Sequence, residues 1–220
     1  MKWNSIKAQS KTRTLGLTPI ACPAFDTVHE RQLNMDEKYL LATKPSRSSR
    51  DRQHEHGGLP DEVELAVGIE VMVTFNIATD LDLANGARGH VVDIVLDERM
   101  KEHTMQLQYL PLYVLMCIKC TEANFALDGL GPGVLPVASL TQTFVVTTFK
   151  GNKTLISRQQ LPITPAYAFT DYRAQAQTIE HCVVDIGKPP YGQLTPFNAY
   201  VALSRSRKRD TIRLLCKFEE

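Results

Sequence analysis

The spacing of apolar residues changes character three times along this chain of 220 residues. Residues 1–43 mix apolar and polar positions and favour helix around residues 3–6 and 36–42. Residues 44–60 are polar without any periodicity, which predicts a linker or an exposed loop. The chain therefore begins with a mixed segment and a polar linker, residues 1–60, ahead of the regular elements.

From Val63 onward the pattern is that of β-strands. The stretch VELAVGIEVMVTF alternates or runs apolar, the turn dipeptide Asn85-Gly86 follows it, and GHVVDIVL reads as the next strand. Further apolar runs, LPLYVLMCI and QTFVVTTF, are separated by the Gly- and Pro-rich LDGLGPGVLPV. Several short strands with turn signals over about 70 residues are typical of a small barrel or sandwich.

Towards the C-terminus the pattern alternates between helix and strand. Residues 166–175 allow a helix, and HCVVDIG reads as a buried strand. Thr195 can cap a helix that begins at Pro196, because proline lacks the N–H group that the first turn leaves unpaired. An apolar stripe covers residues 197–203, and the basic residues 205–209 follow, where cations gain roughly 0.3–1 kcal/mol from the helix dipole. The strand TIRLLC completes a strand–helix–strand unit, which predicts a parallel α/β sheet with the β-rich middle inserted.

Composition and charge narrow the class of protein. The chain is 43% hydrophobic and 22% charged, as in an ordinary soluble globular protein with a buried core. Its net charge of +1 combines +4 over residues 1–60, −8 over residues 61–128 and +5 over residues 129–220. Two basic ends suit contact with phosphate and an acidic middle that faces away, and a solvated surface explains the distribution about as well.

The cysteine content indicates an intracellular protein. Five cysteines, an odd number, lie mostly in apolar runs, which fits reduced thiols better than a disulfide scaffold. Cys117 and Cys120 form a C-x-x-C pair without the second pair that a zinc site needs, so we interpret them as packed thiols. Residues 1–14 contain no apolar core of signal-peptide length, and the apolar run at residues 109–118 is too short to span a membrane.

Several ion-binding and catalytic motifs are present only in part. The acidic stretch at Asp80 resembles a calcium loop, but Gly86 comes one position late and no glutamate closes the loop. Residues 151–154 lack the glycines of a phosphate loop, and no Ser-His-Asp triad has a supporting turn motif. His54 and His56 have no further ligands nearby, so a solvated loop is a stronger interpretation than a metal pair.

Three segments carry a more specific signal. They are VGIEVMVTFNIATDLDLANGARGHVVDI, LPITPAYAFTDYRAQAQTIEHCVVDIG and NAYVALSRSRKRDTIRLL. In this order they resemble the G-x-x-V-M-x-x-x-N…NG-x-x-G segment, motif V and motif VI (Y-V-A-L-[ST]-R) of PIF-family and RecD-like superfamily 1B DNA helicases. The resemblance covers roughly residues 60–220 and is closest to the branch found in fungal genomes and Helitron-type transposons.

The resemblance implies an α/β fold and an ATP-dependent function. Such helicases clamp ATP between two RecA-like domains and move 5′→3′ along single-stranded DNA. Residues 61–89 and 159–220 would form the second RecA-like domain, of the P-loop NTPase type, with a small inserted β-barrel of the Src-homology-3 type at residues 90–158. ATP and Mg²⁺ would be bound mainly by a first, N-terminal RecA-like domain, whose phosphate loop is absent from this chain. We therefore expect the chain alone to be inactive.

The same resemblance implies partners, a location and site residues. Single-stranded DNA and the missing first domain are the expected partners, without a membrane, and the expected setting is the nucleus, in DNA repair and recombination. Arg205 of motif VI would reach the γ-phosphate of ATP, as a catalytic arginine finger. The residues implied for the ATP cleft are Gln175, Gln177 and Thr178. The residues implied for DNA contact are Thr170, Tyr172, Arg173, Asn76 and Arg88.

Plainer interpretations of these residues stay open. Arg205 also fits a cation at a helix end, and the basic residues 207–209 fit a solvated cluster better than a phosphate contact. Motif V itself departs from the family pattern, since Ala176 stands where a glycine is usual and Tyr172-Arg173 replace His-Lys. For the whole chain, the alternative is a truncated, transposon-derived DNA-binding module without enzymatic activity. A β-barrel adaptor would leave motifs V and VI unexplained.

Overall fold

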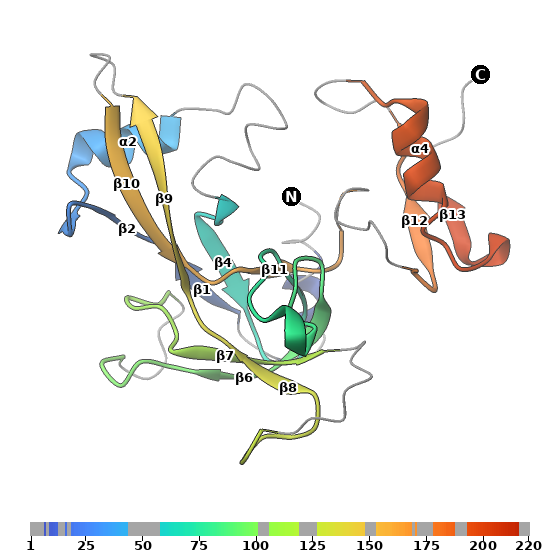
Figure 1. The fold of residues 1–220 in the computed structure, drawn as a ribbon, viewed down its shortest axis with the longest axis horizontal. Coiled ribbons are helices and arrows are strands. Elements are labelled where there is room, and N and C mark those ends of the chain that lie inside the picture. Colours follow the sequence, from blue (N-terminus) through green and yellow to red (C-terminus); the bar gives the residue numbers. More distant parts are fainter. Residues whose placement is uncertain are drawn as a thin grey trace. The chain divides into compact units, whose positions relative to one another are not determined.

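The chain divides into two compact units, residues 1–168 and residues 169–220 (Figure 1). The computed structural model describes residues 7, 9–12, 16, 19–43, 58–100, 106–118, 127–147, 153–168, 170, 178–187 and 193–215. Together the described elements make a mixed α/β protein, in which the first unit is rich in strands and the second is a strand–helix–strand unit.

The described residues of the first unit form three antiparallel sheets. Its strands are β1 (Ile20–Pro23), β2 (Phe25–Val28), β3 (Arg31–Gln32), β4 (Glu62–Leu65), β5 (Glu70–Val73), β6 (Arg88–Val95), β7 (Tyr113–Ile118), β8 (Val134–Val137), β9 (Leu140–Thr147), β10 (Lys153–Gln160) and β11 (Ile163–Pro165). Its described helices include α2 (Met35–Thr43) and the 3-10 turn η2 (Thr79–Leu81). The strand orders are β1-β4, β3-β2-β10-β9 and β11-β5-β6-β7-β8.

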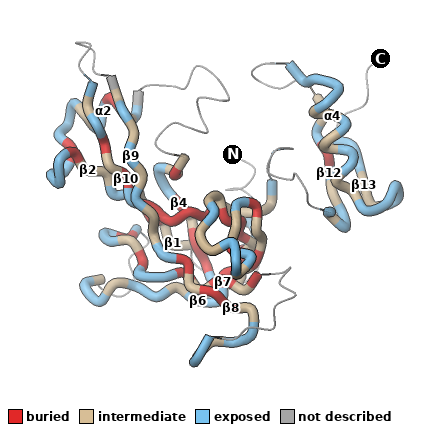
Figure 2. Tube along the Cα trace, viewed as in Figure 1, coloured by how far each residue is buried: buried red, intermediate tan, exposed pale blue. Residues whose placement is uncertain are grey.

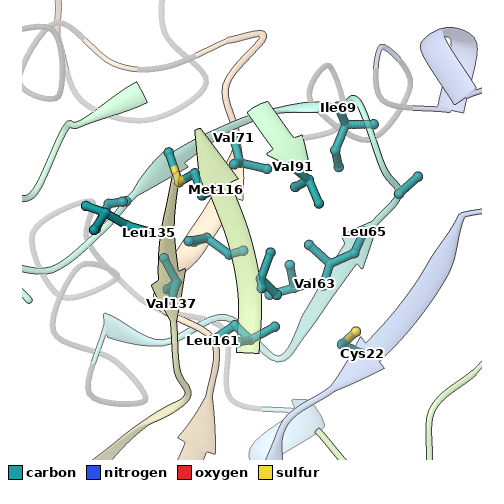
Figure 3. Close-up of a cluster of buried hydrophobic side chains, with 14 of the residues drawn as sticks. Cys22, Val63, Leu65, Ile69, Val71, Val91, Met116, Leu135, Val137 and Leu161 are labelled. Atoms are coloured by element: carbon teal, nitrogen blue, oxygen red, sulfur yellow. The ribbon is translucent and has the colours of Figure 1, made fainter. Parts of the chain in front are cut away.

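The main hydrophobic core is built from the five-stranded sheet and the β1-β4 pair. Figure 3 shows apolar side chains from these strands pointing toward one another. The buried members of this core include Cys22, Val63, Leu65, Val71, Val91, Met116 and Val137. Burial of one aliphatic side chain of this size stabilises a fold by roughly 1.5–3 kcal/mol. A slip of one residue in any strand would turn these side chains outward, so the core fixes the register of the sheet.

The predicted turn at Asn85-Gly86 connects β5 to β6 and is confirmed. Gly86 has a φ angle of +96°, a conformation that glycine adopts without strain. Gly89 lies in β6 so close to β7 that a Cβ atom there would be 2.1 Å from the carbonyl oxygen of Cys117. The NG-x-x-G pattern therefore has a structural cause at each glycine, the turn at the first and the close strand approach at the second.

A second, smaller core lies between the four-stranded sheet and α2. Val28, Leu33 and Ile156 are buried there, with Phe144 and Leu41 packed against them. Helix α2 begins with a reciprocal cap, because the Asn34 side chain accepts from the Glu37 amide and the Glu37 carboxylate accepts from the Asn34 amide. The helix predicted around residues 36–42 is confirmed.

The second unit is a parallel strand–helix–strand unit. Its elements are β12 (Cys182–Val184), α4 (Pro196–Leu203), the 3-10 turn η3 (Arg209–Thr211) and β13 (Ile212–Leu214). β12 and β13 pair in parallel. Thr195 caps α4, because its side chain accepts a hydrogen bond from the Asn198 amide at 3.2 Å, and Pro196 lies in the first turn. The parallel α/β pairing and the helix start expected from the sequence are both confirmed.

Some expectations differ from the structure or lie outside it. The described strands form open sheets and no closed barrel, and strands from residues 90–158 share a sheet with β5 and β11. The boundary expected at residues 89–90 falls inside β6, so the inserted barrel and its limits stay predictions. Residues 166–168 form a bend, in place of the start of the helix expected there. His54, His56 and Cys120 lie outside the described residues.

Candidate functional site

Arg205, the residue expected to act on ATP, follows the C-terminus of α4. Its Nε donates to the carbonyl of Val201 at 3.0 Å, and its Nη2 donates to the hydroxyl of Ser204 at 2.9 Å. Ser204 in turn donates to the same Val201 carbonyl at 2.9 Å. The guanidinium therefore lies half-buried against the last helical turn, where the unpaired carbonyls of a helix end favour a positive charge.

A backbone bridge joins the Arg205 segment to the end of the segment expected to be motif V. The Ile179 amide donates to the Arg205 carbonyl at 2.8 Å, and the Arg207 amide donates to the Ile179 carbonyl at 3.1 Å. Ile179 and Ser206 thereby form an isolated parallel bridge beside the β12-β13 pair. Thr178, which is exposed, immediately precedes Ile179 in the chain. The structure thus brings the last predicted motif V residue into the same unit and the same bridge region as Arg205.

The remaining motif V residues are only partly covered by the structure. Thr170 is exposed, and it belongs to the same unit as Arg205. Gln175, Gln177, Tyr172 and Arg173 lie outside the described residues, and so does the alanine at position 176. Their expected roles at DNA and ATP stay predictions.

Asn76 and Arg88 lie in the first unit, at the turn between β5 and β6. The Asn76 side chain accepts a hydrogen bond from the Asn85 amide at 2.9 Å, which holds the turn in place. Arg88 is half-buried at the start of β6, opposite Met72 of β5. Asn76 therefore has a structural task whether or not it touches DNA.

Motif reasoning missed a buried arginine in the first unit. The Arg158 side chain is 3% exposed, and it donates Nε and Nη2 to the two carboxylate oxygens of Asp26, each at 2.7 Å. Its Nη1 donates to Asp61, and its guanidinium lies over the Phe144 ring, 5.5 Å from the ring centre. Burial lowers the pKa of Arg158, but hydrogen bonds and charge from Asp26, and then from Asp61, outweigh burial and raise it. Since Asp26 and Arg158 are 132 residues apart, no local sequence signal announces this pair.

Arg158 also lines an open cleft of about 500 Å³ between α2 and the four-stranded sheet. Its apolar walls come from Phe25, Leu33 and Leu41. Its charged groups come from Lys38 and from the cluster of Arg158, Asp26 and Asp61. Positive and negative side chains are balanced in this lining, so it selects no class of ligand by charge.

Within the described residues, no group of three or more His, Cys, Asp or Glu side chains is placed to hold a metal ion. No helix in the same part of the chain is long and apolar enough to cross a membrane.

Comparison with known proteins identifies the relatives. No protein-family model matches the chain. The ATP-dependent DNA helicase PIF1 of Homo sapiens is 29% identical over 153 residues, which are 70% of this chain and 19% of that protein. The ATP-dependent DNA helicase PIF5 of Trypanosoma brucei brucei is 43% identical over 67 residues, which are 30% of this chain and 7% of that protein. The homologues of this chain are PIF1-family DNA helicases.

Solved PIF1-family structures share the fold. The Pif1 helicase of Candida albicans matches 99% of this chain and 44% of its own, with a TM-score of 0.58 and 22% identity. Bacteroides Pif1 bound to single-stranded DNA matches 98% of this chain and 39% of its own, with a TM-score of 0.54 and 16% identity. The resemblance to PIF-family helicases inferred from the sequence motifs is confirmed, and the chain spans about a fifth of the length of the human relative.

Proposed function

We propose that this chain is the second RecA-like half of an ATP-dependent DNA helicase that moves 5′→3′. Its share of the reaction would be the arginine finger of motif VI and part of the single-stranded DNA track. The observation that carries the proposal is the position of Arg205, at the end of the helix in a parallel strand–helix–strand unit and bridged by backbone to motif V. Similarity to PIF1-family helicases over 70% of the chain supports it.

Arg205 suits the γ-phosphate for chemical reasons. Phosphoryl transfer spreads negative charge over the oxygens of the transferred group, and a guanidinium keeps its charge and offers a planar fork of donors to them. In this chain the fork is held by Val201 and Ser204, so part of its orientation is set before a nucleotide arrives. Donors that are oriented in advance lose less entropy and reorganise less during the reaction.

ATP would lie between this unit and a first RecA-like domain that supplies the phosphate loop and the ligands for Mg²⁺. Gln175, Gln177 and Thr178 would line the cleft on this side. Residues 90–158 would form an inserted β unit, although their strands share a sheet with β5 and β11.

The proposed DNA contacts come from both units. Thr170, Tyr172 and Arg173 offer a hydroxyl, an aromatic ring and a guanidinium, which suit a phosphate backbone and stacked bases. Asn76 and Arg88 would add contacts from the turn between β5 and β6. A location in the nucleus and tasks in DNA repair and recombination complete the proposal.

A second candidate function is a DNA-binding module without ATPase activity. It is favoured by one observation, that the 220 residues contain no G-x-x-x-x-G-K-[ST] sequence. Both candidates predict binding to single-stranded DNA, and only the helicase half predicts a functional ATP site when its counterpart is supplied.

The deciding experiment joins this chain to the first RecA-like domain of a PIF1-family relative. The chain alone should bind single-stranded DNA without hydrolysing ATP, and the fusion should hydrolyse ATP when single-stranded DNA is added. A folded fusion that binds both ATP and DNA but shows no DNA-stimulated turnover would favour the non-enzymatic module.

A further inference from the structure

Positive charge is concentrated in one short stretch of the second unit. Residues 205–213 contain five Lys or Arg side chains and one Asp, a net charge of +4, in a chain whose total is +1. Arg207, Lys208 and Arg209 are consecutive and exposed, and Arg213 is exposed in β13. The ion pairs between described residues belong to arginines of the first unit. This stretch therefore carries a positive charge that no described ion pair offsets.

The end of helix α4 accounts for only one of these cations. Arg205 donates to the Val201 carbonyl of the last turn at 3.0 Å. The stabilising effect of a helix end fades beyond its last turn, and residues 207–209 follow after the helix has ended at Leu203. The sequence alone favours a solvated cluster for these three side chains, so the structure around them decides between that interpretation and a ligand.

The loop that carries the three cations, residues 206–211, is held by hydrogen bonds around one carbonyl; we call it the basic loop. The Lys208 carbonyl accepts from the Ser206 hydroxyl at 2.8 Å and from the Thr211 hydroxyl at 2.9 Å. The Thr211 amide donates to the same carbonyl at 3.2 Å. Arg213 donates from Nη1 to the Asp210 carbonyl at 2.9 Å, which brings a fourth cation to the loop. A loop ordered in advance loses less entropy when it binds a ligand.

The basic loop is bonded to the segment proposed to contact DNA. The Arg207 amide donates to the Ile179 carbonyl at 3.1 Å, and Ser206 and Ile179 form a parallel β-bridge. Ile179 directly follows residues 170–178, which carry the proposed contacts to DNA and ATP. Because a nucleic acid has a phosphate at every nucleotide, a strand that contacts this segment can also reach the loop through neighbouring phosphates.

We propose that Arg207, Lys208 and Arg209 bind backbone phosphates of single-stranded DNA. This inference rests on the proposed function, because it assigns further residues to the same DNA track. Lysine and arginine offer charge-assisted donors that suit phosphate oxygens and do not select a base. The phosphates of ATP have the same chemistry. However, the charges are spread along a loop, which suits a row of phosphates better than one compact triphosphate.

The test measures binding of the full chain to a fluorescent oligothymidine of about 16 nucleotides, by anisotropy, between about 50 and 200 mM salt. The loop variant combines Arg207→Gln, Lys208→Gln and Arg209→Gln. It should bind about tenfold or more weakly at the lowest salt. The slope of log affinity against log salt should become shallower by about 2, since each phosphate contact of a single strand contributes about 0.7.

A matched control removes the same charge from the first unit. Three lysines there are exposed, Lys7, Lys11 and Lys153. The control variant replaces all three by glutamine. Its affinity for the oligothymidine should stay within about threefold of the unmodified chain, and the salt slope should be unchanged.

A second measurement needs no variant. Lys208 can be acetylated in the unmodified chain and followed by mass spectrometry, with Lys153 as the internal control. Saturating oligothymidine should slow acetylation of Lys208 severalfold, because its ammonium group would be covered by phosphate, and should leave Lys153 unchanged. Equal acetylation of Lys208 with and without DNA contradicts the inference.

The outcomes separate this inference from the function on which it rests. A folded loop variant that binds as tightly as the control, with the same salt slope, would overturn the inference and leave the proposed function in place. Failure of the unmodified chain to bind the oligothymidine would overturn both. In the fusion with a first RecA-like domain, a loop variant that keeps its DNA affinity and loses ATP binding would assign the loop to the nucleotide instead.

Discussion

The backbone amide of Ile179 donates a hydrogen bond to the carbonyl of Arg205 at 2.8 Å. This bond joins the end of the segment expected to be motif V to the expected arginine of motif VI without using either side chain. A shift of the segment that precedes Ile179 would therefore be transmitted to the base of the Arg205 side chain. In the proposed helicase half, the residue proposed to act on ATP would thus be joined to the segment proposed to contact DNA.

The first prediction concerns Gly89. A methyl group at this position would lie 2.1 Å from the carbonyl oxygen of Cys117, and backbone cannot yield as a flexible side chain does. Gly89→Ala should lower the free energy of unfolding by about 2–3 kcal/mol, measured by urea denaturation. Gly131→Ala is the matched control, because its nearest neighbour would be a Val134 methyl at 3.6 Å, an ordinary contact. Equal stability of the two variants would show that β6 and β7 are less close than described.

The second prediction concerns the buried arginine cluster. Asp26 is 16% exposed and Asp61 is 74% exposed, although both bind Arg158. Asp26→Asn should destabilise the fold by about 3 kcal/mol, because it removes the carboxylate charge that is buried together with the guanidinium. Asp61→Asn removes the same charge from an exposed position and should cost under about 1 kcal/mol. The reverse order of the two losses in thermal or urea unfolding would contradict the geometry of the cluster.

Local chemistry in the sequence predicts the local elements well. Thr195 and Pro196 predict the start of α4, and Asn85-Gly86 predicts the turn before β6. Both predictions succeed because capping and turn geometry depend on neighbouring residues only. The parallel pairing of β12 and β13 follows from the order of strand, helix and strand.

Pairings between distant segments could not be predicted in this way. Asp26 and Arg158 meet because β2 pairs with β10, and no residue near either one encodes that choice of partner. The sequence near Arg205 does not encode its backbone bridge either. Sequence spacing places Arg205 at a helix end, but the bridge to Ile179 depends on the register of the parallel strands beside it.

The third prediction uses the thiol of Cys22. Burial, together with the nearby charge of Glu62, raises the pKa of Cys22 from 9.0 to about 12. The folded state therefore keeps the thiol proton of Cys22, while the unfolded state loses it above pH 9. The contribution of this thiol to the free energy of unfolding is fully present below pH 9 and is lost as the pH rises towards 12. The expected loss is about 1.4 kcal/mol per pH unit in this window. The free energy of unfolding of Cys22→Ala should lack this pH dependence when it is measured by urea titration from about pH 8 to pH 11. Parallel pH curves for the two proteins would contradict it.

The fourth prediction tests Ser204 as a positioning residue in the fusion with a first RecA-like domain. Its hydroxyl accepts from Arg205 and donates to Val201, so Ser204→Ala should lower kcat about tenfold with little change in KM for ATP. Ser204→Thr keeps the hydroxyl and should restore turnover. Ser206→Ala is the matched control, since that hydroxyl donates to the Lys208 carbonyl. A loss in Ser206→Ala as large as in Ser204→Ala would assign the effect to the loop as a whole.

The most direct measurement of the central claim is the turnover of the same fusion carrying Arg205→Lys. Lysine keeps the charge but loses the planar fork, so DNA-stimulated kcat should fall sharply, towards the factor of about 10³–10⁵ that such arginines contribute in related phosphoryl-transfer enzymes. Affinity for single-stranded DNA, measured by fluorescence anisotropy on the same preparation, should change less than about threefold. Turnover that stays intact while DNA binding weakens would contradict the assignment of Arg205 to ATP.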